Sequence, residues 1–133
     1  MASKVLFSPV RGVVLRGGVP VVGATVERSY RWVLRDTRGS DTAVTGADGT
    51  FRFDVVTGGG FLSAIMPHEP IIEQKIIISH GGTAFEAWAY SKRDYVENGE
   101  AQRPLVMRCD LETTPRAVKI DDFRRYFGIC DLE

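Results

Sequence analysis

The sequence has no excess of charge of either sign. Seventeen lysine and arginine residues balance seventeen aspartate and glutamate residues, and neither sign is gathered in one segment. A domain that binds nucleic acid usually carries a basic stripe, and a polybasic membrane anchor needs clustered lysine and arginine. The balance therefore argues against nucleic acid as a partner and against such an anchor.

Long apolar runs are also missing. No run approaches the roughly 18 residues of a membrane helix, so we expect no membrane insertion. Ser8-Pro9 interrupts the N-terminal apolar residues before they reach the length of a secretory signal. We expect a soluble, cytoplasmic protein, or a periplasmic or secreted one if a leader has been removed.

Cysteine and histidine are scarce. Cys109 and Cys130 are the only cysteines, and His68 and His80 are the only histidines. Two cysteines that far apart, without partnering histidines, do not make a zinc site, and we expect no metal and no cofactor. The cysteines leave two alternatives open: reduced, partly buried apolar residues, or a disulfide that ties the C-terminal tail to the preceding strand.

What the sequence does have is alternation with a period of two residues. In the segment 24–32, Ala24, Val26, Tyr30 and Trp32 share one face, which is typical of a half-buried antiparallel strand. Arg28 falls on that same face. Either it pairs with a carboxylate in the core, or the face leaves the core before residue 28; we favour the second alternative.

Other segments with apolar runs or alternation predict further strands. They are residues 5–7, 10–15, 42–45, 51–55, 71–79, 83–90, 103–111 and 117–120. The polar segment 35–41 predicts an exposed loop, Asp48-Gly49 predicts a two-residue type I′ turn, and the apolar segment 61–66 is too short to assign to a strand or a helical turn. Asp121-Asp122 before residues 123–127 predicts one capped helical turn near the C-terminus.

These elements predict an all-β protein. We expect one domain over residues 1–133, a single antiparallel β-sandwich of about seven or eight strands.

Three spaced motifs carry a family resemblance. They are Gly12-x-Val14, then Gly18-x-Pro20-Val21-x-Gly23-Ala24-x-Val26, then Thr45-x-Ala47-Asp48-Gly49-x-Phe51-x-Phe53. Together they resemble the pattern of transthyretin-like (prealbumin-like) β-sandwiches, in particular the carboxypeptidase regulatory-like domains. The rest of the chain resembles small stand-alone bacterial proteins of uncharacterised function, which favours a bacterial origin. The motif residues serve turns and core packing, so the resemblance implies a scaffold and no activity.

One enzyme family is similar to these domains, the hydroxyisourate hydrolases. Their Tyr-Arg-Gly-Ser tail corresponds here to Tyr126-Phe127-Gly128-Ile129, which differs at two positions. Acid–base catalysis by His68 and His80 requires both to reach one substrate, and both lie beside turn residues. We therefore expect no enzyme, and keep a small hydrolase as the weakest alternative.

The remaining aromatic residues suggest a binding surface. If Phe85 faces the core, strict alternation turns Trp88 and Tyr90 outward; the reverse orientation buries Trp88. Exposed aromatic residues and arginine are typical of protein-binding hot spots. The candidate patch consists of Tyr30, Trp32, Arg35, Trp88 and Tyr90.

Our leading hypothesis is a non-catalytic bacterial accessory module that binds another protein through this patch. A carbohydrate-binding module that uses the same aromatic rings is the alternative, and self-association stays open.

Overall fold

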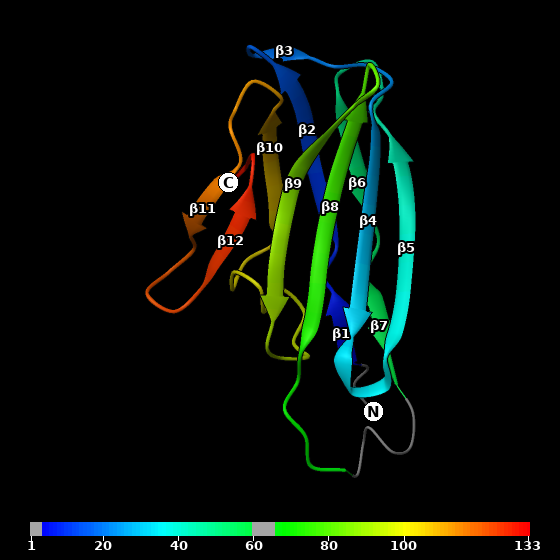
Figure 1. The fold of residues 1–133 in the computed structure, drawn as a ribbon, viewed down its shortest axis with the longest axis vertical. Coiled ribbons are helices and arrows are strands. Elements are labelled where there is room, and N and C mark those ends of the chain that lie inside the picture. Colours follow the sequence, from blue (N-terminus) through cyan, green and yellow to red (C-terminus); the bar gives the residue numbers. More distant parts are fainter. Residues whose placement is uncertain (1–3, 60–65) are drawn as a thin grey trace.

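The computed structural model describes residues 4–59 and 66–133, and it is all-β apart from one turn of 3-10 helix, η1 (Val33–Arg35) (Figure 1). Its strands are β1 (Lys4–Phe7), β2 (Val10–Arg16), β3 (Val19–Pro20), β4 (Thr25–Trp32), β5 (Thr37–Val44), β6 (Thr50–Phe53), β7 (Val56–Gly58), β8 (Ile72–His80), β9 (Thr83–Lys92), β10 (Leu105–Asp110), β11 (Arg116–Lys119), β12 (Arg125–Gly128) and β13 (Cys130–Leu132). They outnumber the seven or eight predicted, because several have only two to four residues. The segment 61–66 lies outside the described residues except for Met66. No helix in the described part of the chain is long and apolar enough to span a membrane.

Two large sheets pack against each other. One has the strand order β11-β12-β9-β8-β4-β5, the other has the order β13-β10-β2-β3 with β6 also paired to β2, and β1 pairs with β7. Both large sheets contribute to one buried cluster, for example Val14 and Phe51 from the second and Ile76 and Trp88 from the first. The all-β sandwich is confirmed, but it is not purely antiparallel, because β2 and β10 run parallel.

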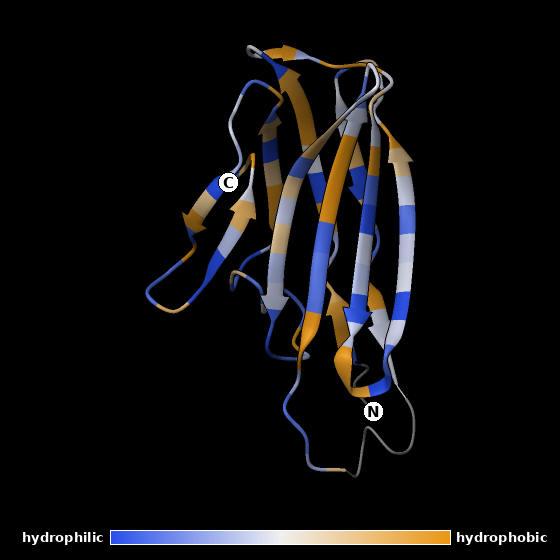
Figure 2. Cartoon of the chain, viewed as in Figure 1, coloured by the Kyte–Doolittle hydropathy of each residue, from blue (hydrophilic) through white to orange (hydrophobic). Residues whose placement is uncertain are grey.

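The predicted alternation and core are confirmed in the N-terminal half. Ala24, Val26, Phe51 and Phe53 are all buried, and apolar and polar residues interleave along the strands in Figure 2. The motifs that carry the family resemblance therefore supply core residues, as their chemistry predicts.

Arg28 is buried within the sandwich, with 1% of its surface exposed. Its Nε and Nη2 donate to the two carboxylate oxygens of Asp41 at 3.0 and 2.7 Å, and it also donates to two backbone carbonyls. Its guanidinium lies 4.9 Å from the ring centroid of Phe7 and 4.7 Å from that of Phe53. Internal pairing is the correct alternative, and the one we favoured from sequence is wrong.

The predicted loop over residues 35–41 is mostly strand. β5 pairs with β4 along its whole length, from Trp32↔Thr37 to Thr25↔Val44. The reversal needs only η1 and Asp36, whose φ is +48°. β5 lies at the sheet edge and is largely exposed, so its polar sequence resembles that of a loop. Pairing with β4 overrides this local signal.

Two predicted turns also differ from the structure. The turn before β6 spans Gly46 to Gly49, with a hydrogen bond from the Gly49 N–H to the Gly46 carbonyl. Gly49 has positive φ but Asp48 does not, so it is not a type I′ turn, and it carries the chain from one sheet to the other. Near the C-terminus, residues 121–124 form the turn of the β11–β12 hairpin instead of a helical turn.

A β-bulge interrupts the pairing of β8 with β9. Ile76 pairs with Trp88, but the next residue of β8, Ile77, pairs with Glu86, so Ala87 is an extra residue on β9. A bulge shifts the alternation by one residue. Phe85 and Trp88 therefore both face the core, although they are separated by an odd number of positions.

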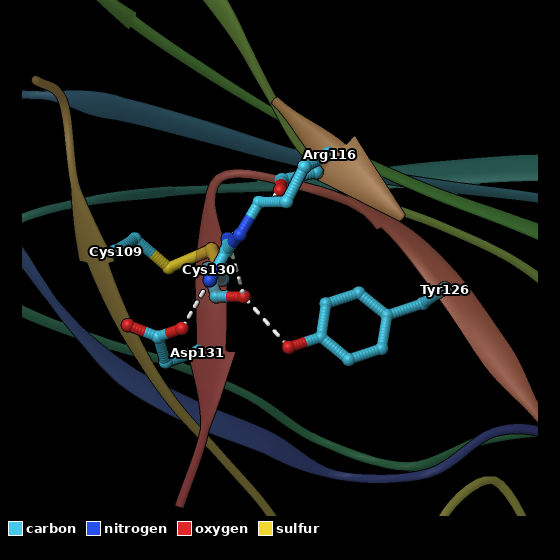
Figure 3. Close-up of a disulfide and its surroundings, with 6 residues drawn as sticks. Cys109, Arg116, Tyr126, Cys130 and Asp131 are labelled. Atoms are coloured by element: carbon cyan, nitrogen blue, oxygen red, sulfur yellow. Dashed lines mark hydrogen bonds and ion pairs between the residues drawn. A yellow bond between two sulfur atoms is a disulfide. The ribbon is translucent and has the colours of Figure 1, made fainter. Parts of the chain in front are cut away.

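A disulfide joins Cys109 to Cys130, which resolves the two alternatives left open by the sequence (Figure 3). The two residues are directly opposite on β10 and β13, with Cα atoms 4.1 Å apart, and both are buried. The Tyr126 hydroxyl donates to the Cys130 carbonyl at 2.7 Å, and Arg116 donates to the same carbonyl and pairs with Asp131. The disulfide thus fixes the base of the β11–β12 hairpin to the sandwich.

Candidate functional site

The five residues of the predicted patch do not form an exposed surface. Trp32 is 2% exposed and Trp88 is fully buried. The register of the six-stranded sheet shows why: Tyr30 and Tyr90 both flank Gln74 on β8, so these aromatic side chains share the inner face of the sheet. The structure does bring these aromatic side chains to one face of the sheet, but that face packs against the core.

Each buried tryptophan has a structural partner. Trp32 packs with Leu6 and Ile72, and its indole N–H donates to the Tyr95 hydroxyl at 2.9 Å. Trp88 stacks on Tyr126 with ring centroids 4.5 Å apart. Neither ring can serve as a platform for a sugar or a protein, so the predicted patch is wrong for both.

The other three patch residues have separate surroundings. Arg35 is exposed and donates to the Gly59 carbonyl at 3.1 Å. Tyr30 is half-buried, and its ring occupies the space that a side chain at Gly39 would fill. Tyr90 is also half-buried, and it is the only one of the five that lines the cleft described next.

The β11–β12 hairpin projects from the side of the sandwich (Figure 1). β12 forms only one ladder pair with β9, Phe127↔Ala89, and otherwise packs on it through side chains such as Tyr126 on Trp88, whereas β11 and β12 pair over four residues. The tip of the hairpin, residues 121–124, forms no ladder pair with β9.

A side chain within the tip holds its shape. The Asp121 Oδ1 accepts hydrogen bonds from the backbone N–H groups of Phe123 and Arg124, both at 2.8 Å, and its Oδ2 pairs with the Arg124 guanidinium. These hydrogen bonds keep the pKa of Asp121 below its usual value, and the one from the Phe123 N–H has the largest effect. The turn fixes Phe123 outward, with 93% of its surface exposed.

A cleft of about 630 Å³ lies between this tip and the end of β9. We call it the hairpin cleft; it is lined by Tyr90, Ser91, Arg93, Asp94, Phe123, Arg124 and Arg125. Burial raises the pKa of Tyr90, so its hydroxyl stays protonated at neutral pH and can donate a hydrogen bond. Arg93 pairs with Glu69 and Arg124 with Asp121, while Arg125 is in no ion pair within residues 4–59 and 66–133.

A smaller hollow of about 430 Å³ adjoins the hairpin cleft and shares Asp94 and Arg124 with it. Its other lining residues come from the segment 96–104. The segment 93–104 contains no strand, so its shape must come from other contacts.

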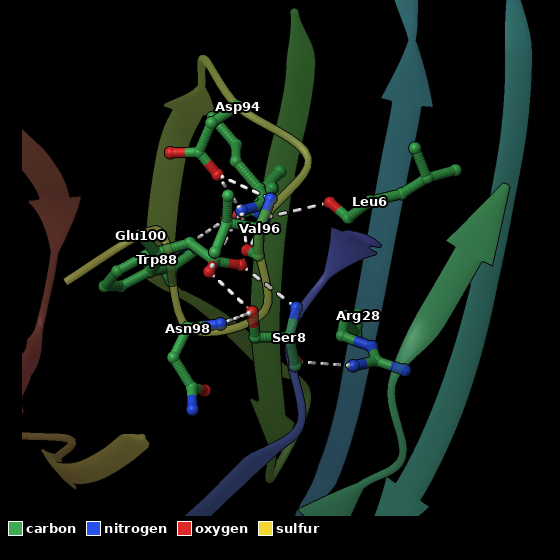
Figure 4. A network of polar contacts seen from close by, with 10 residues as sticks. Leu6, Ser8, Arg28, Trp88, Asp94, Val96, Asn98 and Glu100 are labelled. Carbon is green, nitrogen blue, oxygen red and sulfur yellow. Dashed lines mark hydrogen bonds and ion pairs between the residues drawn. The ribbon is translucent and has the colours of Figure 1, made fainter. Parts of the chain in front are cut away.

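A buried polar network supplies those contacts (Figure 4). Glu100 is fully buried, and its carboxylate accepts hydrogen bonds from the Ser8 N–H at 3.0 Å, the Ser8 hydroxyl at 2.6 Å and the Gln74 amide at 2.9 Å. Lys92 is equally buried, with its Nζ 2.7 Å from Asp94 and 3.5 Å from Glu100. Two buried charges are thus paired and hydrogen-bonded, as burial of charge requires.

The network extends to the outer loop and to the core. The Asn98 N–H donates to the Ser8 hydroxyl at 2.8 Å, and the Trp88 indole donates to Gln74 at 3.1 Å. Within the described residues, every buried side-chain nitrogen and oxygen has a partner. The network therefore ties the loop that forms one wall of the hairpin cleft to both β8 and β9.

Comparison with known proteins gives one family. Residues 10–114 match a family described as a domain of unknown function, DUF6795, and the match covers well over half of the chain. The chain belongs to the DUF6795 family. No curated protein and no solved structure matches it. The DUF6795 match includes the sandwich strands β2 to β10 and the segment 93–104, and it ends before the β11–β12 hairpin.

The histidines of this DUF6795 chain lie far apart. His80 ends β8, and His68 lies before the start of that nine-residue strand, which spans roughly 26 Å at 3.3 Å per residue. His68 lies between the Met66 carbonyl and the Tyr95 hydroxyl, both at 2.7 Å. Within one chain, the two histidines therefore lie at opposite ends of β8 and do not form a common site. Within the described ranges, no three histidine, cysteine, aspartate or glutamate side chains are grouped to hold a metal ion.

Sequence reasoning missed Phe123, Arg124 and Arg125 as surface residues. The Asp121-Asp122 pair suggested a helix cap, and the following aromatic and arginine residues were assigned to one helical turn. An aspartate that bonds the backbone two and three residues ahead also begins a turn. Exposed Arg125 and Phe127 alternate with buried Tyr126 and Gly128 in the strand, but the adjacent aromatic residues hide this alternation in the sequence.

Proposed function

We propose that this DUF6795 protein is a non-catalytic interaction module that binds another protein at the hairpin cleft, with Phe123 as the anchor. The observation that carries the proposal is the exposure of Phe123 on a turn that Asp121 holds in place. A phenylalanine in water gains about 1.5–3 kcal/mol when it is buried against a partner. Because the turn is already ordered, little entropy is lost on binding.

The charges around Phe123 indicate what the partner presents. Arg124 and Arg125 follow Phe123 in the chain and line the cleft with it, as does Arg93 at the end of β9. Arginine beside an aromatic anchor is typical of binding hot spots, and guanidinium groups pair well with carboxylates. The partner surface we expect is an apolar pocket bordered by aspartate or glutamate.

We also propose a family relationship and a cellular compartment for the protein. The buried positions of Ala24, Val26 and Phe51 support the transthyretin-like resemblance, and the proposed bacterial origin rests on the resemblance of the rest of the chain to small bacterial proteins. The Cys109–Cys130 disulfide supports an oxidising compartment such as the periplasm in place of the cytoplasm, because disulfides persist mainly there.

Site-specific photocrosslinking tests the proposal. A photoreactive phenylalanine analogue at position 123 should crosslink one protein in native cells, which mass spectrometry then identifies. The same analogue at Val19, which is 65% exposed on β3, is the control and should not crosslink that protein. Equal crosslinking from both positions, or none from position 123, contradicts the proposal.

A further inference from the structure

A second feature lies on the outer face of the five-stranded sheet. Arg11 on β2 and Arg52 on β6 are directly opposite each other, and both are exposed. Neither forms an ion pair with any residue in 4–59 or 66–133. Like charges directly opposite in a sheet destabilise it. This arrangement is therefore more favourable when an anion lies between the two guanidinium groups.

The two arginines lie at a groove of about 710 Å³. Its lining includes the aliphatic side chains of Val13, Val44 and Val106, and Val44 is 62% exposed. This volume falls within the range of small-molecule sites, which combine an apolar lining with a few polar groups that orient the ligand.

One carboxylate of the chain also lines the groove. Glu133 is the acidic residue among its lining residues. Its backbone has other partners: the Glu133 N–H donates to the Val106 carbonyl, and the Glu133 carbonyl accepts from Arg103. It forms no ion pair with Arg11 or Arg52 among the described contacts. The positive charge of the arginine pair is thus left for an external anion.

We propose that this groove binds a small aliphatic carboxylate. The carboxylate accepts hydrogen bonds from Arg11 and Arg52, whose planar guanidinium groups suit its geometry. The hydrocarbon chain lies along the three valines and covers apolar surface that is otherwise in water. The site is separate from the hairpin cleft, so it goes beyond the proposed interaction function.

An NMR titration with decanoate, below its micellar concentration, tests the inference. Decanoate should shift the amide signals around Val13, Val44 and Val106 in a saturable way. Decanol lacks the anion and decyltrimethylammonium reverses its charge, so each should bind roughly ten-fold more weakly or worse.

The variants separate the arginine pair from general effects. Arg11→Gln with Arg52→Gln should weaken decanoate binding roughly ten-fold or more, while Arg16→Gln, an exposed residue of the same strand, should leave it unchanged. Both arginines of the pair are exposed, so a thermal melt should show the double variant folded. Phe123→Ser should bind decanoate normally, which distinguishes this site from the hairpin cleft. Absence of shifts in the unmodified protein, or equal binding by the double variant, overturns the inference.

Discussion

Replacing Cys109 and Cys130 together by alanine should lower the free energy of unfolding by roughly 3.3 kcal/mol. The figure follows from the loop that the disulfide closes, since the two cysteines are 21 positions apart in the sequence and the entropy lost by the unfolded chain grows with the logarithm of loop length. The closed loop contains the whole β11–β12 hairpin. Its loss should therefore act most strongly on the hairpin.

Urea unfolding followed by tryptophan fluorescence measures the change, since Trp32 and Trp88 are both buried. In a thermal melt, the same loss should lower Tm by about 10–15 °C for a chain of this size. The unmodified protein refolded under reducing conditions is the control and should match the double alanine variant. Hydrogen exchange should accelerate first in residues 116–128.

A loss of stability below about 1 kcal/mol would refute this reasoning. It would mean that the contacts of Arg116 and Tyr126 with the last strand already hold the hairpin base in place. Unchanged hydrogen exchange in the hairpin would lead to the same conclusion.

Three further predictions concern the parts that support the hairpin cleft. Glu100→Leu should lower the free energy of unfolding in urea by about 3–5 kcal/mol, because it removes the buried carboxylate from a charged network. Its control is Glu73→Leu on the exposed face, which should change the free energy of unfolding by less than about 0.5 kcal/mol. Gly128→Ala should cost about 1–3 kcal/mol, since its φ of +153° is strained for alanine and the added Cβ would overlap a backbone carbonyl of β9. Gly59→Ala is the control, because a Cβ at Gly59 meets nothing within 4 Å among the described residues. The folded-state pKa of Asp121 lies below its unfolded value of about 3.9, so its contribution to the turn is present above that pH and is lost as the pH falls through the lower folded value. An NMR titration of its carboxyl carbon with a midpoint at or above the unfolded value would contradict the assigned hydrogen bonds.

The sequence was sufficient for the sandwich and much of its core. Alternation alone placed Ala24 and Val26 on one face, and the spaced motifs marked Phe51 and Phe53 as core residues; all four are buried. These predictions depend on a local period of two residues, which a regular strand preserves.

The errors arise where a long-range contact changes a local pattern. The bulge at Ala87 shifts the alternation of β9, so that Trp88 is buried. No residue in that segment predicts the bulge. β5 has the composition of a loop and becomes a strand only because β4 pairs with it. The candidate site depends on how far the hairpin tip stands from β9, which is a property of packing between elements distant in the sequence.

The affinity of the partner identified from position 123 is the measurement that tests the central claim most directly. Burial of the Phe123 ring contributes about 1.5–3 kcal/mol, so Phe123→Ser should weaken binding roughly 10- to 150-fold without changing the thermal melt. Val19→Ser, an exposed apolar residue on β3, should leave the affinity unchanged. Equal affinities for the two variants would contradict Phe123 as the anchor of the hairpin cleft.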